Sequence, residues 1–441
     1  MPKAVPLLVG EVTIDFTMPT RTAEAKVRLG GIAHAGRGLW AAGQDYAVGA
    51  FCPGYLVEQA RDYLTQHGCK EFILLGEITG APNLVAIADV REIGHQGYED
   101  ILRHARRVVP NPRHLSLDQF DPVIIFPGTY SLEGVLSEIK SGARVTIDAA
   151  YDIDEVSLQS LSGRIDRVVI STSSDLFARI ATADVTPLLD LARDIRARHL
   201  LLKENRGGSR LFDLSSGHVE QINASLGVTI NSVGVGDAFT AVFGALDGNA
   251  RDAAWRGMQV ATVYSQTTWP DDLKRDVGRE LRMSVDVARG LGGASLPWHV
   301  RPNLPIYLAA PDFSYAPHIE IDTAVAALKY HNFRVRRPVR ENGESKRDAP
   351  IETLLPYYIS DVQLLRECSA VFAIPIERDP GTLVEVGLAI EMGKPVITFD
   401  PRNENRNTMV VAGSAAYSSD LDICLNGVFE TLTKCRGGSG P

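Results

Sequence analysis

The sequence predicts an α/β protein in which a large αβα sandwich is followed by a smaller, doubly wound parallel domain. Short apolar runs typical of buried strands alternate with helical patterns along the chain, which favours mostly parallel sheets covered by helices. Glycine and proline interrupt this alternation at about residues 290–304, and it then starts again. We expect domains over residues 1–290 and 305–435, a linker over 291–304 and a disordered tail over 436–441.

Composition is that of a soluble globular enzyme and argues against several other classes. Of the 441 residues, 45% are hydrophobic and 22% are charged, which is ordinary for such proteins. The formal net charge of −9 argues against a general nucleic-acid binder, and no apolar run reaches the roughly 18 residues that a membrane span needs. The five cysteines are scattered without CxxC pairs, which predicts free thiols and no zinc site. With no signal peptide at its start, the chain is expected to be cytoplasmic.

The first part of the chain contains strand-like and helical segments in alternation. Apolar runs predict strands over residues 5–10, ended by Gly10, and over 72–75, 123–128, 144–148, 168–171 and 199–202. Helices are predicted over residues 31–43, over 56–64 with Gly68 as the C-cap, and over 188–195. Ligands of such sheets bind at the carboxyl ends of the strands, so Gly10, Asp148 and the loop 234–237 are expected to converge there.

Residues 231–246 carry the clearest chemical signal of this part. They read Asn-Ser-Val-Gly-Val-Gly-Asp-Ala-Phe-Thr and then Ala-Val-Phe-Gly-Ala-Leu, so a glycine turn feeds an apolar helix. Free N–H groups and the helix dipole at such a start attract a phosphate, and glycine lets it come close to the backbone. Asp237 would then serve as general base for an attacking hydroxyl. The alternative is an ordinary first-turn aspartate on a buried helix, and this stretch alone leaves both open.

The order of these motifs resembles the ribokinase (PfkB) family of sugar and nucleoside kinases over roughly residues 4–290. An aspartate follows the first strand, a Gly-Gly pair opens the first helix, and Gly-x-Gly-Asp opens a late apolar helix. The resemblance implies a ribokinase-like fold, ATP as phosphate donor, and Mg²⁺ that enters with it without metal ligands from the protein. It also implies that Asp237 is the catalytic base and that the backbone of Gly234, Val235 and Gly236 forms an anion hole. The acceptor would be bound by Asp15, Gly31 and His34.

Some residues depart from the pattern of this family. His34 stands where the family usually has a substrate-binding asparagine, and residues 231–232 are Asn-Ser instead of Asp-Thr. Residues 172–175 read Thr-Ser-Ser-Asp in place of an Asn-x-x-Glu element, and residues 203–209 replace a Thr-x-Gly-x-x-Gly nucleotide loop. These departures leave the phosphate donor, and the kinase activity itself, open.

A new α/β pattern starts at about residue 305. Residues 306–311 are predicted to form a strand and then a turn, and further strands are predicted over 369–376 and 394–399, with a helix over 321–328. About 135 residues suffice for one compact domain, most simply a flavodoxin-like doubly wound sheet. A basic run at residues 334–340 is interpreted as a solvated loop, with a phosphate-contacting loop as the alternative.

The informative stretch of this part is residues 379–395, which reads as a loop, a helix and a turn into the next strand. Thr382 and Glu385 fit a Thr-x-x-Glu capping box, which alone would explain both residues. The other interpretation is a carboxylate cluster for cleavage at an anomeric carbon, with one carboxylate as nucleophile and another handling the proton of the leaving group. Asp379, just before the helix, and Asp361, at another expected helix start, are available for this role. Spacing alone favours the capping box.

The wider pattern over roughly residues 305–432 is similar to nucleoside 2-deoxyribosyltransferases and nucleoside 5′-monophosphate N-glycosidases. It comprises Tyr-Leu-Ala-Ala-Pro-Asp-Phe at 307–313, Asp361, Asp-x-Gly-Thr-x-x-Glu-x-Gly-x-Ala at 379–389, Gly-Lys-Pro at 393–395 and Asn-Thr-Met at 407–409. The resemblance implies that Glu385 is the nucleophile on C1′ of the sugar and that Asp361 and Asp379 contact the base and handle the proton. It places Tyr307, Asn407 and Met409 at the sugar site. Whether water or a second base takes the sugar stays open.

Together the two motif sets predict a bifunctional enzyme of nucleoside salvage or turnover. In one order, the first domain phosphorylates a nucleoside and the second splits the monophosphate into free base and (deoxy)ribose 5-phosphate. In the other order, cleavage comes first and the released pentose is phosphorylated. The alternative is a nucleotide-sensing protein whose kinase-like domain only binds a ligand and regulates the glycosidase domain. The expected partners are nucleoside and nucleotide substrates and a second copy of the chain in a dimer, with no nucleic acid and no membrane.

Overall fold

The computed structural model describes residues 5–20, 24–113, 115–150, 152–181, 184–344 and 349–437. The chain divides into two compact units. Unit 1 comprises Met1–Glu92, Gln96–Ser225 and Thr229–Gly292, and unit 2 comprises Ile93–His95, Leu226–Val228 and Gly293–Pro441. Both units combine helices and strands in the layered α/β manner that the sequence predicts. In the ranges described, no helix has the length and apolar character needed to cross a membrane.

Unit 1 is organised around a large, mostly parallel sheet with the strand order β13-β12-β11-β10-β9-β8-β1-β3-β4-β7. The strands from β11 to β4 in this order are parallel, and β12, β13 and β7 add antiparallel pairs at the edges. The central strands are apolar along most of their length because helices cover both faces of the sheet. The bounds are β1 (Leu7–Thr17), β3 (Tyr46–Pro53), β4 (Cys69–Thr79), β7 (Arg107–Pro110), β8 (Val123–Ile125), β9 (Val145–Asp148), β10 (Arg167–Ser171), β11 (His199–Lys203), β12 (Ser209–Asp213) and β13 (Val219–Ile222).

The second half of β1 pairs with a different set of strands. It is antiparallel to β2 (Lys26–Gly31) and parallel to β5 (Leu84–Ile87), which also pairs with β6 (Glu99–Ile101). The prediction that Gly10 ends the first strand is wrong, because β1 continues to Thr17 and carries Asp15. Gly10 instead leaves room for the Ile32 side chain, which would lie 2.3 Å from a Cβ at this position.

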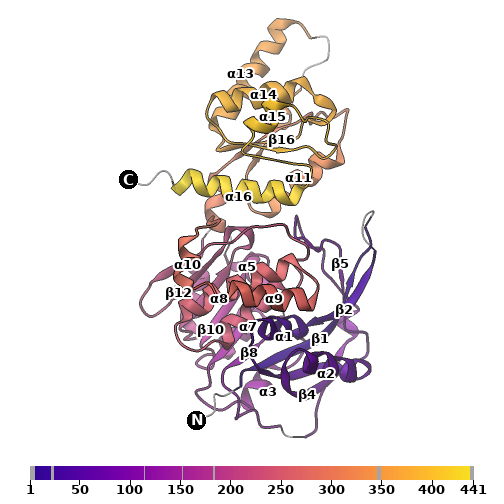
Figure 1. Cartoon of the computed structure of the whole chain (residues 1–441), viewed down its shortest axis with the longest axis vertical. Coiled ribbons are helices and arrows are strands. Elements are labelled where there is room, and N and C mark those ends of the chain that lie inside the picture. Colours follow the sequence, from indigo (N-terminus) through magenta and orange to yellow (C-terminus); the bar gives the residue numbers. More distant parts are fainter. Residues whose placement is uncertain are drawn as a thin grey trace. The chain divides into compact units, whose positions relative to one another are not determined.

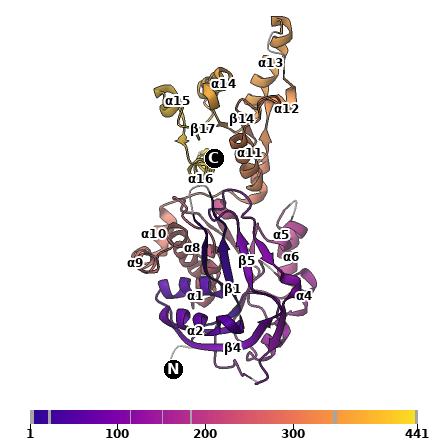
Figure 2. The same ribbon diagram turned by 90° about the vertical axis from the view of Figure 1, so that its right-hand side faces the viewer.

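Helices cover both faces of the sheet in unit 1. Figure 2 shows α1, α8 and α9 on one side of β1 and α4, α5 and α6 on the other. On the first side, α1, α7 and α8 share one apolar core with β1 and β3, to which Leu39, Ala241 and Val260 belong. The bounds are α1 (Ile32–Ala41), η1 (Gly54–Leu56), α2 (Val57–Gln66), η2 (Arg103–Ala105), α3 (Leu132–Ser137), α4 (Glu155–Ser160), α5 (Asp175–Ile180), α6 (Thr186–Asp194), η3 (Asn205–Gly207), α7 (Val235–Ala245), α8 (Ala250–Gln266), α9 (Pro270–Glu280) and α10 (Val285–Gly290).

Unit 2 contains a five-stranded sheet in which every neighbouring pair is parallel. Its order β15-β14-β16-β17-β18 is the 2-1-3-4-5 order of flavodoxin-like folds, so this prediction is confirmed. Figure 1 shows α11 and α16 on one side of this sheet and α13 and α14 on the other. The bounds are η4 (Trp298–Asn303), β14 (Ile306–Ala309), α11 (Ile319–Tyr330), β15 (Val335–Arg336), α12 (Pro338–Asn342), α13 (Ile351–Glu367), β16 (Ala370–Ala373), η5 (Ile376–Arg378), α14 (Pro380–Glu391), β17 (Val396–Phe399), α15 (Thr408–Gly413), β18 (Ala416–Ser418) and α16 (Leu421–Gly437).

The interpretation of the basic run at residues 334–340 as a solvated loop is wrong, because the run forms β15 and α12. The guanidinium groups of Arg336 and Arg337 are paired with carboxylates. Arg336 lies 2.7 Å from Glu341, and Arg337 donates from Nε and Nη2 to the two oxygens of the buried Asp312. These pairs hold β15 and α12 against the loop after β14.

The prediction of a disordered tail over residues 436–441 is wrong for residues 436 and 437, which are helical. α16 continues to Gly437, and residues 438–441 lie outside the described residues. The buried Phe429 and Leu432 anchor this helix, so its last turn continues from a packed segment.

Candidate functional site

The candidate site of unit 1 is the amino-terminal turn of α7. Gly234 is the N-cap of this helix with a φ of 83°, a left-handed conformation that glycine adopts without strain. A Cβ at Gly234 would lie 2.2 Å from Cγ of His34, so the turn packs directly against that imidazole ring. Among the described residues, the N–H groups of Gly234, Gly236 and Asp237 have no acceptor. They are free donors at the positive end of a helix dipole, which is an arrangement suited to a phosphate group.

At Val235 the structure differs from the expected anion hole. Its N–H donates to the carbonyl of Ser232 at 3.1 Å, which closes a turn just before the helix and makes this N–H unavailable to a ligand. The N–H of Asp237, which the sequence interpretation leaves out of the hole, takes its place as the third free donor.

Asp237 stands in this turn with an unpaired carboxylate. The side chain is partly buried and makes no hydrogen bond or ion pair in the described part of the chain, so it does not cap α7. Burial raises its pKa from an ordinary 3.8 to about 6. The charges of His34 and Lys203 act against this rise, and that of Asp148 adds to it. A carboxylate that titrates near neutral pH is suited to remove a proton from a hydroxyl.

The structure joins Asp15 and His34, which the sequence suggests as two separate contacts to the acceptor. Oδ2 of Asp15 lies 2.7 Å from Nε2 of His34, and Nδ1 of His34 lies 2.8 Å from the hydroxyl of Tyr264. Burial acts to raise the pKa of Asp15, but His34 and Arg28 outweigh it and hold this pKa below its ordinary value. This chain of hydrogen bonds fixes the ring that packs against the α7 turn. Gly31 lies nearby as the N-cap of α1, with a φ of 59°.

Lys203 is a buried residue of this site that the sequence interpretation treats only as part of a nucleotide loop. Its Nζ lies 2.9 Å from Oδ2 of Asp148, 3.2 Å from Oγ1 of Thr240 and 3.3 Å from the carbonyl oxygen of Gly236. Asp148 ends β9 and Lys203 ends β11, so Asp148 and the loop 234–237 do converge at the carboxyl ends of the strands. A charged residue directly at the end of an apolar strand is the signal that could have singled out Lys203.

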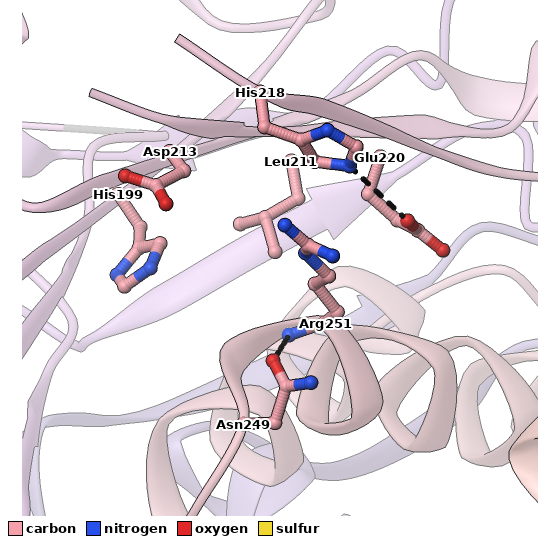
Figure 3. A pocket seen from close by; sticks show the side chains of 7 residues that line it. All are labelled: His199, Leu211, Asp213, His218, Glu220, Asn249 and Arg251. Carbon is pink, nitrogen blue, oxygen red and sulfur yellow. Dashed lines mark hydrogen bonds and ion pairs between the residues drawn. The ribbon is translucent and has the colours of Figure 1, made fainter. Parts of the chain in front are cut away.

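A separate cavity of about 270 Å³ in unit 1 lies at the opposite, amino-terminal end of β11. Figure 3 shows it between β12, β13 and the start of α8, with Asn249 accepting a hydrogen bond from the backbone of Arg251. Its lining residues are His199, Leu211, Asp213, His218, Glu220, Asn249 and Arg251. None of the predicted site residues lines it, so it belongs to neither candidate site.

In unit 2 the capping box predicted for Thr382 and Glu385 is wrong. α14 begins earlier than that interpretation requires, with Asp379 as its N-cap. Oδ2 of Asp379 accepts hydrogen bonds from the N–H of Thr382 at 2.7 Å and from its hydroxyl at 2.8 Å. Pro380 follows at the first helical position, where its missing N–H costs no hydrogen bond. Glu385 is therefore free of a capping role.

The carboxylate of Glu385 instead contacts Tyr307. The hydroxyl of Tyr307, a fully buried residue of β14, donates to Oε1 of Glu385 at 2.6 Å. Burial raises the pKa of Glu385 from an ordinary 4.5 to about 8, the hydrogen bond from Tyr307 lowers it, and Asp361 and Asp379 raise it further. The two aspartates therefore lie within electrostatic reach of Glu385, as a carboxylate cluster requires.

Asp361 lies inside α13 and not at a helix start, because this helix already begins at Ile351. Its Oδ1 accepts a hydrogen bond from Nδ2 of Asn342 at 2.8 Å, a partner that the sequence interpretation misses. Burial raises the pKa of Asp361 above its ordinary value, against the effect of this hydrogen bond. A carboxyl group with a raised pKa is suited to hold a proton and deliver it.

Asn407 and Met409 lie at the start of α15 and are exposed. Asn407 is the N-cap of this helix, and its Oδ1 accepts from the N–H of Met409 at 2.9 Å. Capping explains Asn407 without a ligand, and the side chain of Met409 is 79% exposed. Among the described residues neither forms a hydrogen bond with Glu385, and their place at the sugar site stays a prediction.

For the glycosidic cleavage that the sequence predicts, we expect Tyr307→Phe to lower the rate at neutral pH by about tenfold, because it removes a hydrogen bond to a charged group. This hydrogen bond lowers the pKa of Glu385, so the acid limb of the kcat/KM profile moves to higher pH in the variant. Initial rates of base release over a range of about pH 5 to 10 measure both effects. Tyr358→Phe, at an exposed tyrosine of α13, is the matched control. Coinciding profiles of Tyr307→Phe and the wild type would contradict this role of the hydroxyl.

Comparison with known proteins gives a family for the second part of the chain. Residues 306–421 match the family model described as nucleoside 2-deoxyribosyltransferase, which confirms the resemblance stated from the motifs. A search of curated proteins finds no match.

Solved structures similar to the chain cover its first part. A nucleoside kinase from Burkholderia thailandensis in complex with ADP-inosine is 14% identical with a TM-score of 0.49, and the match covers 66% of this chain and 99% of that one. A ribokinase from Thermotoga maritima is 13% identical with a TM-score of 0.47, covering 64% and 100%. A putative ribokinase II from E. coli, in complex with ATP and Mg²⁺, is 11% identical with a TM-score of 0.46, covering 64% and 99%.

Proposed function

We propose that this chain, whose residues 306–421 form a nucleoside 2-deoxyribosyltransferase domain, is a bifunctional enzyme of nucleoside metabolism. Unit 2 cleaves the N-glycosidic bond of a nucleoside or nucleoside 5′-monophosphate and releases the free base. Unit 1 transfers a phosphoryl group from ATP to a hydroxyl of a nucleoside or pentose. The observation that carries the proposal is the Glu385 carboxylate, which is free of helix capping, bound by Tyr307 and flanked by two further carboxyl groups.

In the proposed cleavage, ionised Glu385 attacks C1′ of the sugar. The C1′–N bond breaks, its electron pair goes to the base, and a carboxyl group supplies the proton that the base needs. Asp361 is the better candidate for the proton donor, because its pKa is raised by burial, whereas Oδ2 of Asp379 already accepts two hydrogen bonds from Thr382. Water or a second base then attacks C1′ of the glycosyl ester and regenerates Glu385.

In the proposed phosphoryl transfer, Asp237 removes the proton from the acceptor hydroxyl as the hydroxyl oxygen attacks the γ-phosphorus of ATP. The bond from this phosphorus to the bridging oxygen breaks, and ADP leaves with the electron pair. The N–H groups of Gly234, Gly236 and Asp237 would face the transferred group and stabilise its negative charge. Mg²⁺ is proposed to enter with ATP, because this ion is usually bound through the phosphates of the substrate. When bound, it neutralises charge on those phosphates.

A panel of nucleosides, nucleoside monophosphates and free ribose, incubated with and without ATP and Mg²⁺ and read by mass spectrometry, tests both activities. Free base that appears from nucleosides only with ATP indicates phosphorylation before cleavage. Free base without ATP, followed by phosphorylation of the released pentose, indicates the other order. No free base from any nucleoside or nucleotide would overturn the proposal for unit 2.

A further inference from the structure

Unit 1 contains a buried lysine, Lys203, whose ammonium group has a hydrogen-bond acceptor for each of its three protons. Lys203 is 9% exposed, and its Nζ donates to Asp148, Thr240 and the carbonyl oxygen of Gly236. An ammonium group has three protons, so every donor of this side chain has a partner within 3.3 Å. Burying such a charge is costly unless it is paired, which indicates that its position is specified by the fold.

The partners of Lys203 connect the candidate turn to the sheet. Gly236 lies in the first turn of α7 and Thr240 lies one turn further, and the Thr240 hydroxyl also donates to Oδ2 of Asp148 at 2.5 Å. A Cβ at Gly236 would stand 3.2 Å from Nζ, so the ammonium packs directly on the turn. Lys203 thus ties the first turn of α7 to the carboxyl ends of β9 and β11.

We propose that Lys203 is a positioning residue for the phosphoryl transfer of unit 1. Its ammonium holds the first turn of α7 in place, so that the free N–H groups and the Asp237 carboxylate keep a common orientation. It also places a fixed positive charge beside the incoming phosphoryl group, where negative charge develops. This inference rests on the kinase function proposed above.

The competing explanation is that Lys203 only neutralises Asp148, a side chain that is 3% exposed. Among the described residues, the charges that act on the pKa of Asp237 include those of His34 from α1, Asp148 from β9, Lys203 from β11 and Asp15 from β1. Lys203 lowers the pKa of Asp237 and Asp148 raises it. Removing both members of the pair therefore takes away one influence that lowers the pKa of Asp237 and one that raises it, while it abolishes the anchor of the turn. This separates the two explanations.

The test compares Lys203→Met, the double variant Lys203→Met/Asp148→Asn and Lys203→Arg with the wild type. The readouts are kcat and KM for phosphoryl transfer across pH, and circular dichroism checks the fold of each variant. We expect Lys203→Met to lower kcat by about 10- to 100-fold, with a smaller change in KM, and to move the acid limb to higher pH. In the double variant the acid limb returns toward that of the wild type while kcat stays low. Lys203→Arg, which keeps a cation, recovers part of kcat, and Lys70→Met, at an exposed lysine of β4, leaves all values unchanged.

Each outcome is decisive for the inference. A double variant with the kcat of the wild type would show that Lys203 only neutralises Asp148, and so would Lys203→Met with unchanged kcat and pH profile. If Lys203→Met fails to fold, the double variant, which buries no unpaired charge, carries the comparison. If the wild type transfers no phosphoryl group to any acceptor in the panel, the kinase function fails and this inference fails with it. Transfer by the wild type together with unaffected variants overturns the inference alone.

Discussion

Glu385→Gln is expected to lower base release by at least about 10³-fold, because removal of a nucleophile abolishes the covalent route. The amide has nearly the shape of the carboxylate, and its oxygen can still accept the hydrogen bond that Tyr307 now donates to Oε1. It cannot form a glycosyl ester at C1′. The loss should therefore appear in kcat as well as in kcat/KM, measured by the appearance of free base under saturating substrate.

Glu391→Gln is the control for this change. Glu391 ends the same helix and is exposed, so its substitution alters the charge of α14 without touching the carboxylate cluster. Acid quenching during turnover, followed by mass spectrometry of the peptide that contains Glu385, should find the pentosyl ester in the wild type and in Glu391→Gln. Base release that persists in Glu385→Gln would refute the nucleophile assignment.

Because the pKa of Glu385 is raised in the folded state, Glu385→Gln is expected to be more stable relative to the wild type at high pH than at low pH. An unfolded glutamate ionises at about 4.5, whereas folded Glu385 keeps its proton until about pH 8, so the folded state binds more protons in this interval. The contribution of Glu385 to stability is therefore lost as pH rises from about 4.5 to about 8, and Glu385→Gln lacks this part of the loss. Thermal denaturation measured at several pH values in this range should show that the melting temperature of Glu385→Gln increases relative to that of the wild type as pH rises. This separates loss of chemistry from loss of folding.

The local pattern of unit 2 predicts the strands β14, β16 and β17 and the flavodoxin-like strand order, but it misses β15 and β18 and misassigns the start of α14. Thr382 and Glu385 have the spacing of a capping box, and spacing alone cannot tell which residue before the helix is the cap. The decisive signal is Asp379 followed by Pro380, because aspartate is a strong N-cap and proline favours the first helical position. The contact between Glu385 and Tyr307 joins residues far apart in the chain, so no local pattern contains it.

The same limit applies to unit 1. The glycine turn and Asp237 are adjacent in sequence, and their helix start is predicted from the pattern of residues 231–246. The ion pair of Lys203 with Asp148 and the hydrogen bond of His34 with Asp15 depend on strand order and helix packing. Which N–H groups of the turn stay free depends on a single backbone hydrogen bond from Val235, which the residue types do not specify.

Asp237→Asn is expected to lower phosphoryl transfer by about 10²- to 10⁴-fold, the usual contribution of a general base. The amide fits the same space but cannot accept the proton of the acceptor hydroxyl. In the wild type the rate should rise as pH passes through about 6, where Asp237 loses its proton, and this limb should be absent from the residual activity of the variant. Transfer of labelled phosphate to the best acceptor of the panel measures both.

Asp271→Asn is the matched control, because Asp271 is an exposed aspartate in the first turn of another helix, α9. It removes a carboxylate from the same kind of helix position, so any effect of the helix dipole alone appears in both variants. Folded Asp237 keeps its proton up to about pH 6, whereas an unfolded aspartate ionises at about 3.8. Its contribution to stability is therefore lost as pH rises through that interval, and Asp237→Asn lacks this part of the loss.

If Asp237→Asn transferred the phosphoryl group as fast as the wild type, Asp237 would not be the general base, but the protein would still be a kinase. Absence of transfer by the wild type would instead favour the nucleotide-sensing alternative. That alternative requires base release by unit 2 to respond to ATP while no phosphorylated product forms. It also requires the response to survive in Asp237→Asn, because the free N–H groups that would contact the phosphates belong to the backbone. A response that disappears with the Asp237 carboxylate fits neither role, because a ligand bound only by the backbone donors would not depend on that side chain.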